Sequence, residues 1–163
     1  MIRILNCSNN PESDYTKEHG YLDSDIIVLL KENARIFECK FVNRNGDILL
    51  TNNIFPLENR DVGIPKIQII DYLETSDEYK YKNDQIVNSA LIADHVVFTT
   101  QSLKDLFKKF YPDIKLKNSS VIDNTNKLIV IKNYYKIITE LCGKKEEPVS
   151  DKETRISWKR NKK

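Results

Sequence analysis

The sequence predicts one α/β domain, a doubly wound and mainly parallel Rossmann-like sheet over residues 1–142, followed by a basic tail over residues 143–163. Two observations support this prediction. Short apolar runs alternate with segments whose apolar residues recur at helical spacing, which is typical of βαβ units. Hydrophobic residues make up 40% of the 163 residues, which is enough for one packed core.

Six short runs predict the strands. Most are apolar, and the first ends at the turn-forming residues Ser8-Asn9-Asn10-Pro11. The second alternates between apolar and polar residues and is followed by the turn residues Asn45-Gly46. The run at 66–70 is apolar on both faces, so we expect it at the centre of the sheet. The predicted strands cover residues 2–7, 34–42, 47–51, 66–70, 96–98 and 119–122.

Helical spacing predicts helices over residues 24–33, 83–93 and 102–111. Pro112 ends the third of these, because proline has no N–H for the helix and its ring clashes with the preceding turn. Residues 128–141 fit two alternatives equally: a strand followed by a helix, or one long helix.

The carboxyl ends of parallel strands form one edge of a sheet, and ligands usually bind there. Asp71 follows the predicted central strand directly, where a carboxylate could contact a ligand or act as a general base. Asn52 and Thr99 follow neighbouring strands at the same edge. The alternative for Asp71 is a structural role in the turn.

Several classes of site are not expected. The four glycines are isolated, so no glycine-rich loop is present to hold a phosphate, and we expect no cofactor. The three cysteines lack paired spacing, which argues against a metal site and favours reduced thiols in the cytoplasm or another reducing intracellular compartment. No apolar run approaches the roughly 20 residues that span a bilayer.

Four segments in order resemble the second half of the N-terminal, acceptor-side domain of GT-B glycosyltransferases of the glycogen-synthase-like group. The resemblance covers about residues 46–124, and its most specific part begins at Ala93 and ends at Tyr111. The segments are Gly46-Asp47-Ile48-Leu49-Leu50-Thr51-Asn52, Ile64-Pro65-Lys66-Ile67-Gln68-Ile69-Ile70-Asp71, Ala93-Asp94-His95-Val96-Val97-Phe98-Thr99-Thr100-Gln101-Ser102-Leu103 and Ser120-Val121-Ile122-Asp123-Asn124.

This resemblance implies a glycosyltransferase-like half domain. The donor-binding domain of the family has no counterpart here, so a nucleotide-sugar would bind only if a second chain supplied that domain. The expected roles are catalysis or acceptor contact for Asp71, and substrate binding for Asn52, Thr99 and Ser102. A non-catalytic binding or assembly module is the other form of this hypothesis.

A weaker resemblance to ribosomal protein S2 offers the alternative of a structural subunit in a large assembly. It rests on Gly63-Ile64-Pro65, the following strand to Asp71, and Asn83-Asp84 at the start of a helix.

The tail differs in charge from the rest of the chain. Residues 143–163 contain eight Lys or Arg against four Asp or Glu, which gives the tail a net charge of +4. The other 142 residues have a net charge of −2, because the whole chain has +2. A basic segment with one large aromatic residue favours contact with a protein partner, a larger assembly or a nucleic-acid backbone. The expected contact residues are Arg155, Trp158, Lys159 and Arg160.

Overall fold

The computed structural model describes residues 1–6, 25–55 and 63–146 and contains one six-stranded sheet whose pairs are all parallel. The predicted α/β class is confirmed. The strand order is β2-β1-β3-β4-β5-β6. The strands are β1 (Ile2–Asn6), β2 (Cys39–Val42), β3 (Ile48–Asn52), β4 (Lys66–Ile70), β5 (His95–Phe98) and β6 (Ser119–Val121).

The two central strands are β3 and β4, and every residue of both is buried. Residues 66–70 therefore lie where the sequence predicts them. The reason is that helices cover both faces of a parallel sheet, so its central strands are buried on both sides and are mostly apolar.

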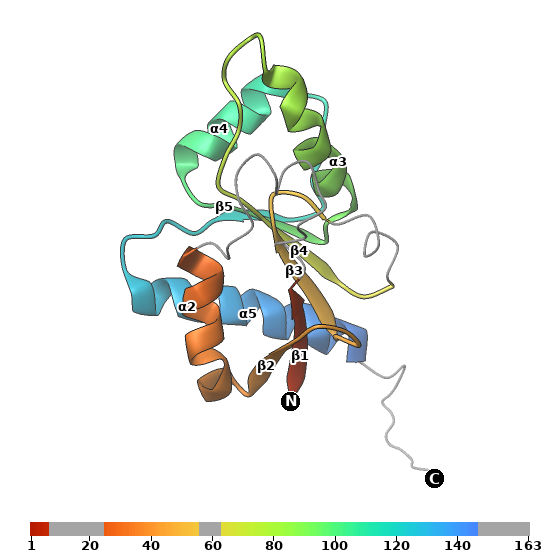
Figure 1. The fold of residues 1–163 in the computed structure, drawn as a ribbon, viewed down its shortest axis with the longest axis vertical. Helices are drawn as coiled ribbons and strands as arrows, with labels where there is room; N and C mark the ends of the chain where they lie inside the picture. Colours follow the sequence, from red (N-terminus) through yellow and green to blue (C-terminus); the bar gives the residue numbers. More distant parts are fainter. Residues whose placement is uncertain (7–24, 56–62, 147–163) are drawn as a thin grey trace.

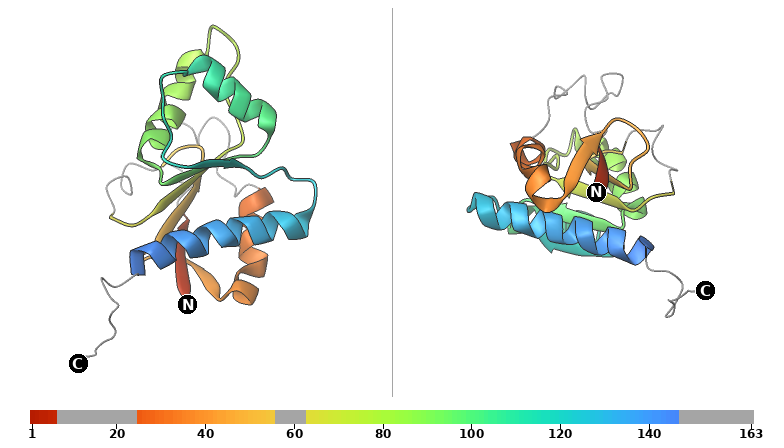
Figure 2. Two further views of the ribbon diagram at one scale, coloured as in Figure 1. Left: turned by 180° about the vertical axis from the view of Figure 1, so that it is seen from behind. Right: turned by 90° about the horizontal axis from the view of Figure 1, so that it is seen from below.

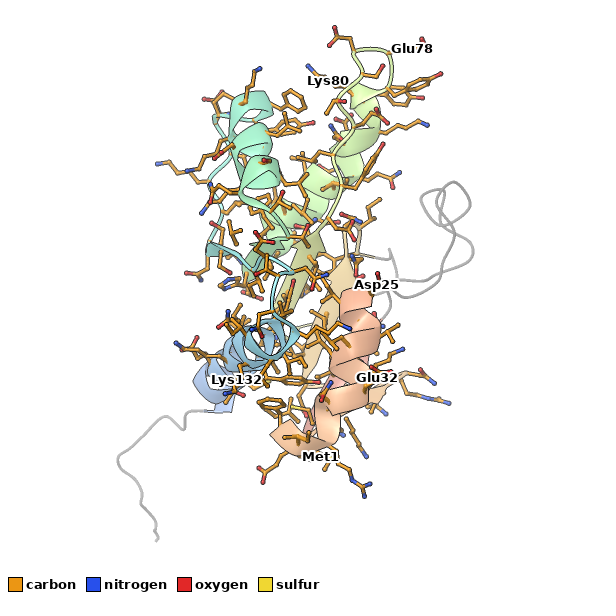
Figure 3. All side chains as sticks on the ribbon, turned by 90° about the vertical axis from the view of Figure 1, so that its left-hand side faces the viewer. Met1, Asp25, Glu32, Glu78, Lys80 and Lys132 are labelled. Atoms are coloured by element: carbon orange, nitrogen blue, oxygen red, sulfur yellow. The ribbon has the colours of Figure 1, made fainter. Side chains whose placement is uncertain are left out.

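Helices cover the two faces in pairs (Figures 1 and 2). On one face, α2 (Asp25–Asn33) and α5 (Lys127–Glu146) enclose a core that includes Leu30, Leu50 and Tyr134. On the other face, α3 (Asp84–Ile92) and α4 (Gln101–Phe110) enclose a second core around Phe98 and Phe107. Figure 3 shows side chains filling the space between the sheet and both helical layers.

The strand expected over residues 34–42 is only partly correct. Residues Ala34–Phe37 form a 3₁₀ turn, η1, and only Cys39–Val42 join the sheet. Glu38 ends that turn in the left-handed conformation (φ 57°) and redirects the chain into β2. The apolar residues of the turn mimic strand alternation, but Ile36 is 75% exposed and Phe37 stacks on Tyr135 at 4.5 Å.

Of the two alternatives for residues 128–141, the structure has the single helix. α5 has 20 residues and continues to Glu146, past the domain boundary expected at residue 142. Another 3₁₀ turn, η3 (Lys80–Asn83), leads into α3. Among the described residues, no helix is both long enough and apolar enough to cross a membrane.

Candidate functional site at the carboxyl edge of the sheet

Asp71 lies at the carboxyl edge of the sheet, the edge at which the strands end, and two asparagine side chains hold it there. The Asn52 side chain donates to Asp71 Oδ2 at 2.8 Å, and the Asn53 side chain donates to Asp71 Oδ1 at 2.8 Å. Asp71 is exposed. An ionised carboxylate has about four acceptor positions, so two remain for a ligand.

Asn53 connects the ends of β3 and β4. Its side-chain oxygen accepts from the Asp71 backbone N–H at 3.2 Å, and its own N–H donates to Ile69 O at 2.8 Å. It has φ 60°, a left-handed conformation that asparagine tolerates better than most residues. The side chain of Gln68, in β4, donates to Asn53 O at 2.6 Å. The orientation of the carboxylate is thus fixed by the backbone as well as by side chains.

The alternation of side chains along each strand decides which face the site belongs to. Leu50, Ile69 and Val97 pack in the core under α2 and α5. Asn52, Asp71 and Thr99 each lie two residues further along the chain. They therefore fall on this same face, at the carboxyl ends of three neighbouring strands.

Thr99 adjoins Asp71 through the backbone, because its N–H donates to Ile70 O at 3.1 Å. Ser102 lies apart, exposed in the first turn of α4, and has no hydrogen bond to Asp71 among the described residues. The structure thus brings together Asn52, Asp71 and Thr99, which with Asn53 are called the Asp71 site below.

Two buried polar atoms near this site have no hydrogen-bond partner within the described residues: Gln68 Oε1 and the Tyr134 hydroxyl. Gln68 lies on the α3 face, where its amide also donates to Ile86 O at 2.9 Å. Tyr134 belongs to α5. Burial, together with the charge of Asp71, raises the pKa of Tyr134 above its ordinary value.

Sequence reasoning missed Asn53, Gln68 and Tyr134. For Asn53 there was a signal, since a pair of asparagines directly follows an apolar strand. The polar Gln68 within an apolar strand was a weaker signal. Nothing in the sequence near Tyr134 relates it to Asp71, because their proximity depends on how α5 packs.

A groove of about 510 Å³ lies at the opposite edge of the sheet and is lined in part by Lys66, Asp94 and Lys117. Its charged groups already have partners. Asp94 accepts from the Lys66 backbone N–H at 2.8 Å and lies 3.7 Å from the Lys117 ammonium group, while Lys66 Nζ donates to Ile64 O. Asp94 is therefore a structural residue, and this groove offers a ligand little unpaired charge.

Exposed aromatic and basic residues meet at the tip of the molecule, where Figure 3 places Glu78 and Lys80. Lys80 lies 4.1 Å from the centre of the Phe110 ring, and Lys82 lies 4.8 Å from that of Tyr79. These cation–π contacts favour a packing role for both lysines.

No group of metal-binding side chains occurs in the part of the chain that the structure describes. The tail residues Arg155, Trp158, Lys159 and Arg160 lie outside that part.

In comparisons with known proteins, no family model, no curated protein and no solved structure matches this chain. The class of protein is defined by fold and site: a Rossmann-like α/β domain with an anchored, exposed carboxylate at the carboxyl edge of its sheet.

Proposed function

We propose that this chain is a glycosyltransferase-like half domain that binds a sugar or a similar polyhydroxylated acceptor at the Asp71 site. The observation that carries the proposal is the exposed Asp71 carboxylate, held at both oxygens by asparagine amides. A carboxylate in a fixed orientation accepts hydrogen bonds from ligand hydroxyls, and such charge-assisted bonds are stronger than neutral ones. It could also accept a proton from an attacking hydroxyl as a general base.

The order of the family-like segments supports the same proposal. The four segments that resemble the acceptor-side domain of GT-B enzymes coincide with β3, β4, β5 with α4, and β6. These strands are consecutive neighbours in the sheet. Asn52, Asp71 and Thr99 lie at the carboxyl ends of three of them, where open α/β sheets bind ligands.

Catalysis would require a separate surface that binds the nucleotide-sugar, because the Asp71 site supplies an acceptor-side surface only. Alone, the chain would act as a binding module. The alternative of an S2-like structural subunit gains no support from its own signature residues: Asn83 is buried, and its side chain closes a loop by hydrogen bonds to the backbone N–H and C=O of Glu74.

The test is a titration of the isotope-labelled chain, followed by amide NMR signals. Neutral mono- and disaccharides should shift the signals of Asn52, Asn53, Asp71 and Thr99 with dissociation constants on the order of 1 mM, which is about −4 kcal/mol and plausible for half of a cleft. A nucleotide-sugar should bind no better than the free sugar. Shifts confined to the groove beside Asp94, or no shifts, would refute the proposal.

The substitution Asp71→Asn should weaken sugar binding by about tenfold or more, because a hydrogen bond to a charged group contributes about 1.5–3 kcal/mol. The unfolding transition should remain close to that of the unaltered chain, since one side-chain oxygen still accepts from an asparagine. Asp94→Asn is the matched control at the opposite edge and should leave sugar binding unchanged. A variant Asp71→Asn that fails to fold would make Asp71 a structural residue.

A further inference from the structure

Two adjacent tyrosines of α5 are buried in the same core, but only one hydroxyl has a protein partner. The Tyr135 hydroxyl donates to Leu30 O at 2.5 Å. The Tyr134 side chain is 0% exposed, and its hydroxyl has no hydrogen-bond partner in the described residues. A buried hydroxyl without a partner costs free energy, and phenylalanine would fill almost the same volume without that cost.

Tyr134 belongs to the helix that covers the face of the sheet on which the Asp71 site lies. Figure 2 shows α5 lying across one face of the sheet, and the core that it covers includes Leu50, Ile69 and Val97. Side chains of a helix lean toward its N-terminus, and α5 begins six residues after β6 ends at Val121, on the carboxyl side of the sheet. The charge of Asp71 also acts on the Tyr134 hydroxyl.

We infer that Tyr134 is a binding residue of the Asp71 site: its hydroxyl donates to a ligand oxygen that in turn donates to the Asp71 carboxylate. This inference rests on the proposed function and restricts the chemical class of the ligand. The group between the two residues must accept one hydrogen bond and donate another, as a hydroxyl does. A phosphate or carboxylate in that position would meet the negative charge of Asp71.

The ligand class is therefore a neutral polyol or sugar that inserts one hydroxyl between Asp71 and α5. A water molecule has the same donor and acceptor capacity and can take this position in the free protein. The two sources of the oxygen differ in a measurable way. A ligand hydroxyl makes Tyr134 important for affinity, whereas a permanent water makes it important for the stability of the free chain.

The experiment compares Tyr134→Phe with Tyr135→Phe, a matched pair at adjacent positions of one helix. Urea unfolding of the free proteins comes first and needs no ligand. Tyr134→Phe should be as stable as the unaltered chain or more stable, whereas Tyr135→Phe should be less stable because Leu30 O loses its donor. If Tyr134→Phe is destabilised as much as Tyr135→Phe, the hydroxyl has an internal structural partner and the inference is wrong.

Binding is measured second, by the same NMR titration with D-glucose, D-galactose and D-mannose and with their 6-phosphates. Tyr134→Phe should raise the dissociation constant of the neutral sugars about tenfold, Tyr135→Phe should leave it unchanged, and the phosphates should bind less tightly than the neutral sugars. Unchanged affinity in Tyr134→Phe would overturn the inference while leaving the proposed function standing. If no sugar binds the unaltered chain, the proposed function fails and the inference, which rests on it, fails with it.

Discussion

Asn53 shows how one residue can set the geometry of a site. Its left-handed backbone ends β3, its side chain bridges the carboxylate and the backbone N–H of Asp71, and its carbonyl accepts from Gln68. Glycine tolerates this backbone conformation without strain, but it has no side chain to orient Asp71. Asparagine provides both functions, which explains why the Asp71 site depends on a residue that is itself almost fully buried.

The backbone contribution of Asn53 can be isolated by comparing Asn53→Gly with Asn53→Ala. Both variants lose the side-chain hydrogen bonds, but alanine also has to adopt the left-handed conformation, so it should be less stable than glycine by about 1–2 kcal/mol. Urea denaturation measures the difference.

The control for this comparison is Asn88, an exposed residue within α3. Glycine is a poor residue inside a helix, so Asn88→Gly should be less stable than Asn88→Ala by about 1 kcal/mol, the reverse order. Equal stability of the two Asn53 variants would show that the left-handed conformation does not persist.

At the scale of elements, the segment that leads into β3 packs tightly against β1. Asp47 accepts from the Arg3 backbone N–H at 2.8 Å and donates its own N–H to Arg3 O at 2.7 Å. A Cβ on Gly46 would lie 2.7 Å from Leu5 Cβ, closer than real side chains approach. Glycine is therefore required here by the close approach of β1, whereas the left-handed residue of the turn is Asn45, with φ 58°.

Gly46→Ala should therefore destabilise the protein by about 1–3 kcal/mol, the usual range for overpacking. Gly63→Ala is the matched control, because nothing lies within 4 Å of a Cβ at that position. Thermal or urea unfolding of the two variants tests the packing of β1 against this turn. A cost at Gly63 equal to that at Gly46 would contradict it.

At the scale of the whole molecule, the sheet separates two cores, and every described residue of both lies before position 143. Deleting residues 148–163 should therefore change the free energy of unfolding by less than about 0.5 kcal/mol, as for most surface changes. A large loss of stability would mean that the tail packs on its own domain.

The tail is proposed to contact a partner, and its charge leaves a nucleic-acid backbone as one target. Fluorescence anisotropy with a labelled oligonucleotide, at low and at physiological salt, compares the full chain with the truncated one. Salt-sensitive binding that disappears with the tail would identify nucleic acid, because phosphate contacts weaken steeply as salt rises. Equal binding by both chains would remove the tail from the proposal.

The sequence by itself determined the fold class, the central position of residues 66–70 and the placement of Asn52, Asp71 and Thr99 at one edge. These follow from local patterns, because strand alternation and the parallel arrangement fix which residues share an edge. It misassigned Ala34–Phe37, where a 3₁₀ turn carries apolar residues at spacing that resembles a strand. A short apolar run does not by itself distinguish a strand from a helical turn, because tertiary packing outweighs the local secondary-structure propensity.

Only the tertiary structure decided that residues 127–146 form one helix and that this helix places Tyr134 over the face of the sheet to which Asp71 belongs. The two residues lie 63 positions apart in the chain, so no local sequence pattern relates them. Tyr134 lies there because α5 packs on the face of the sheet that also presents Asn52, Asp71 and Thr99. The same holds for Asn53, whose sequence neighbourhood predicts a turn but whose hydrogen bonds to Asp71 require β3 and β4 to lie side by side.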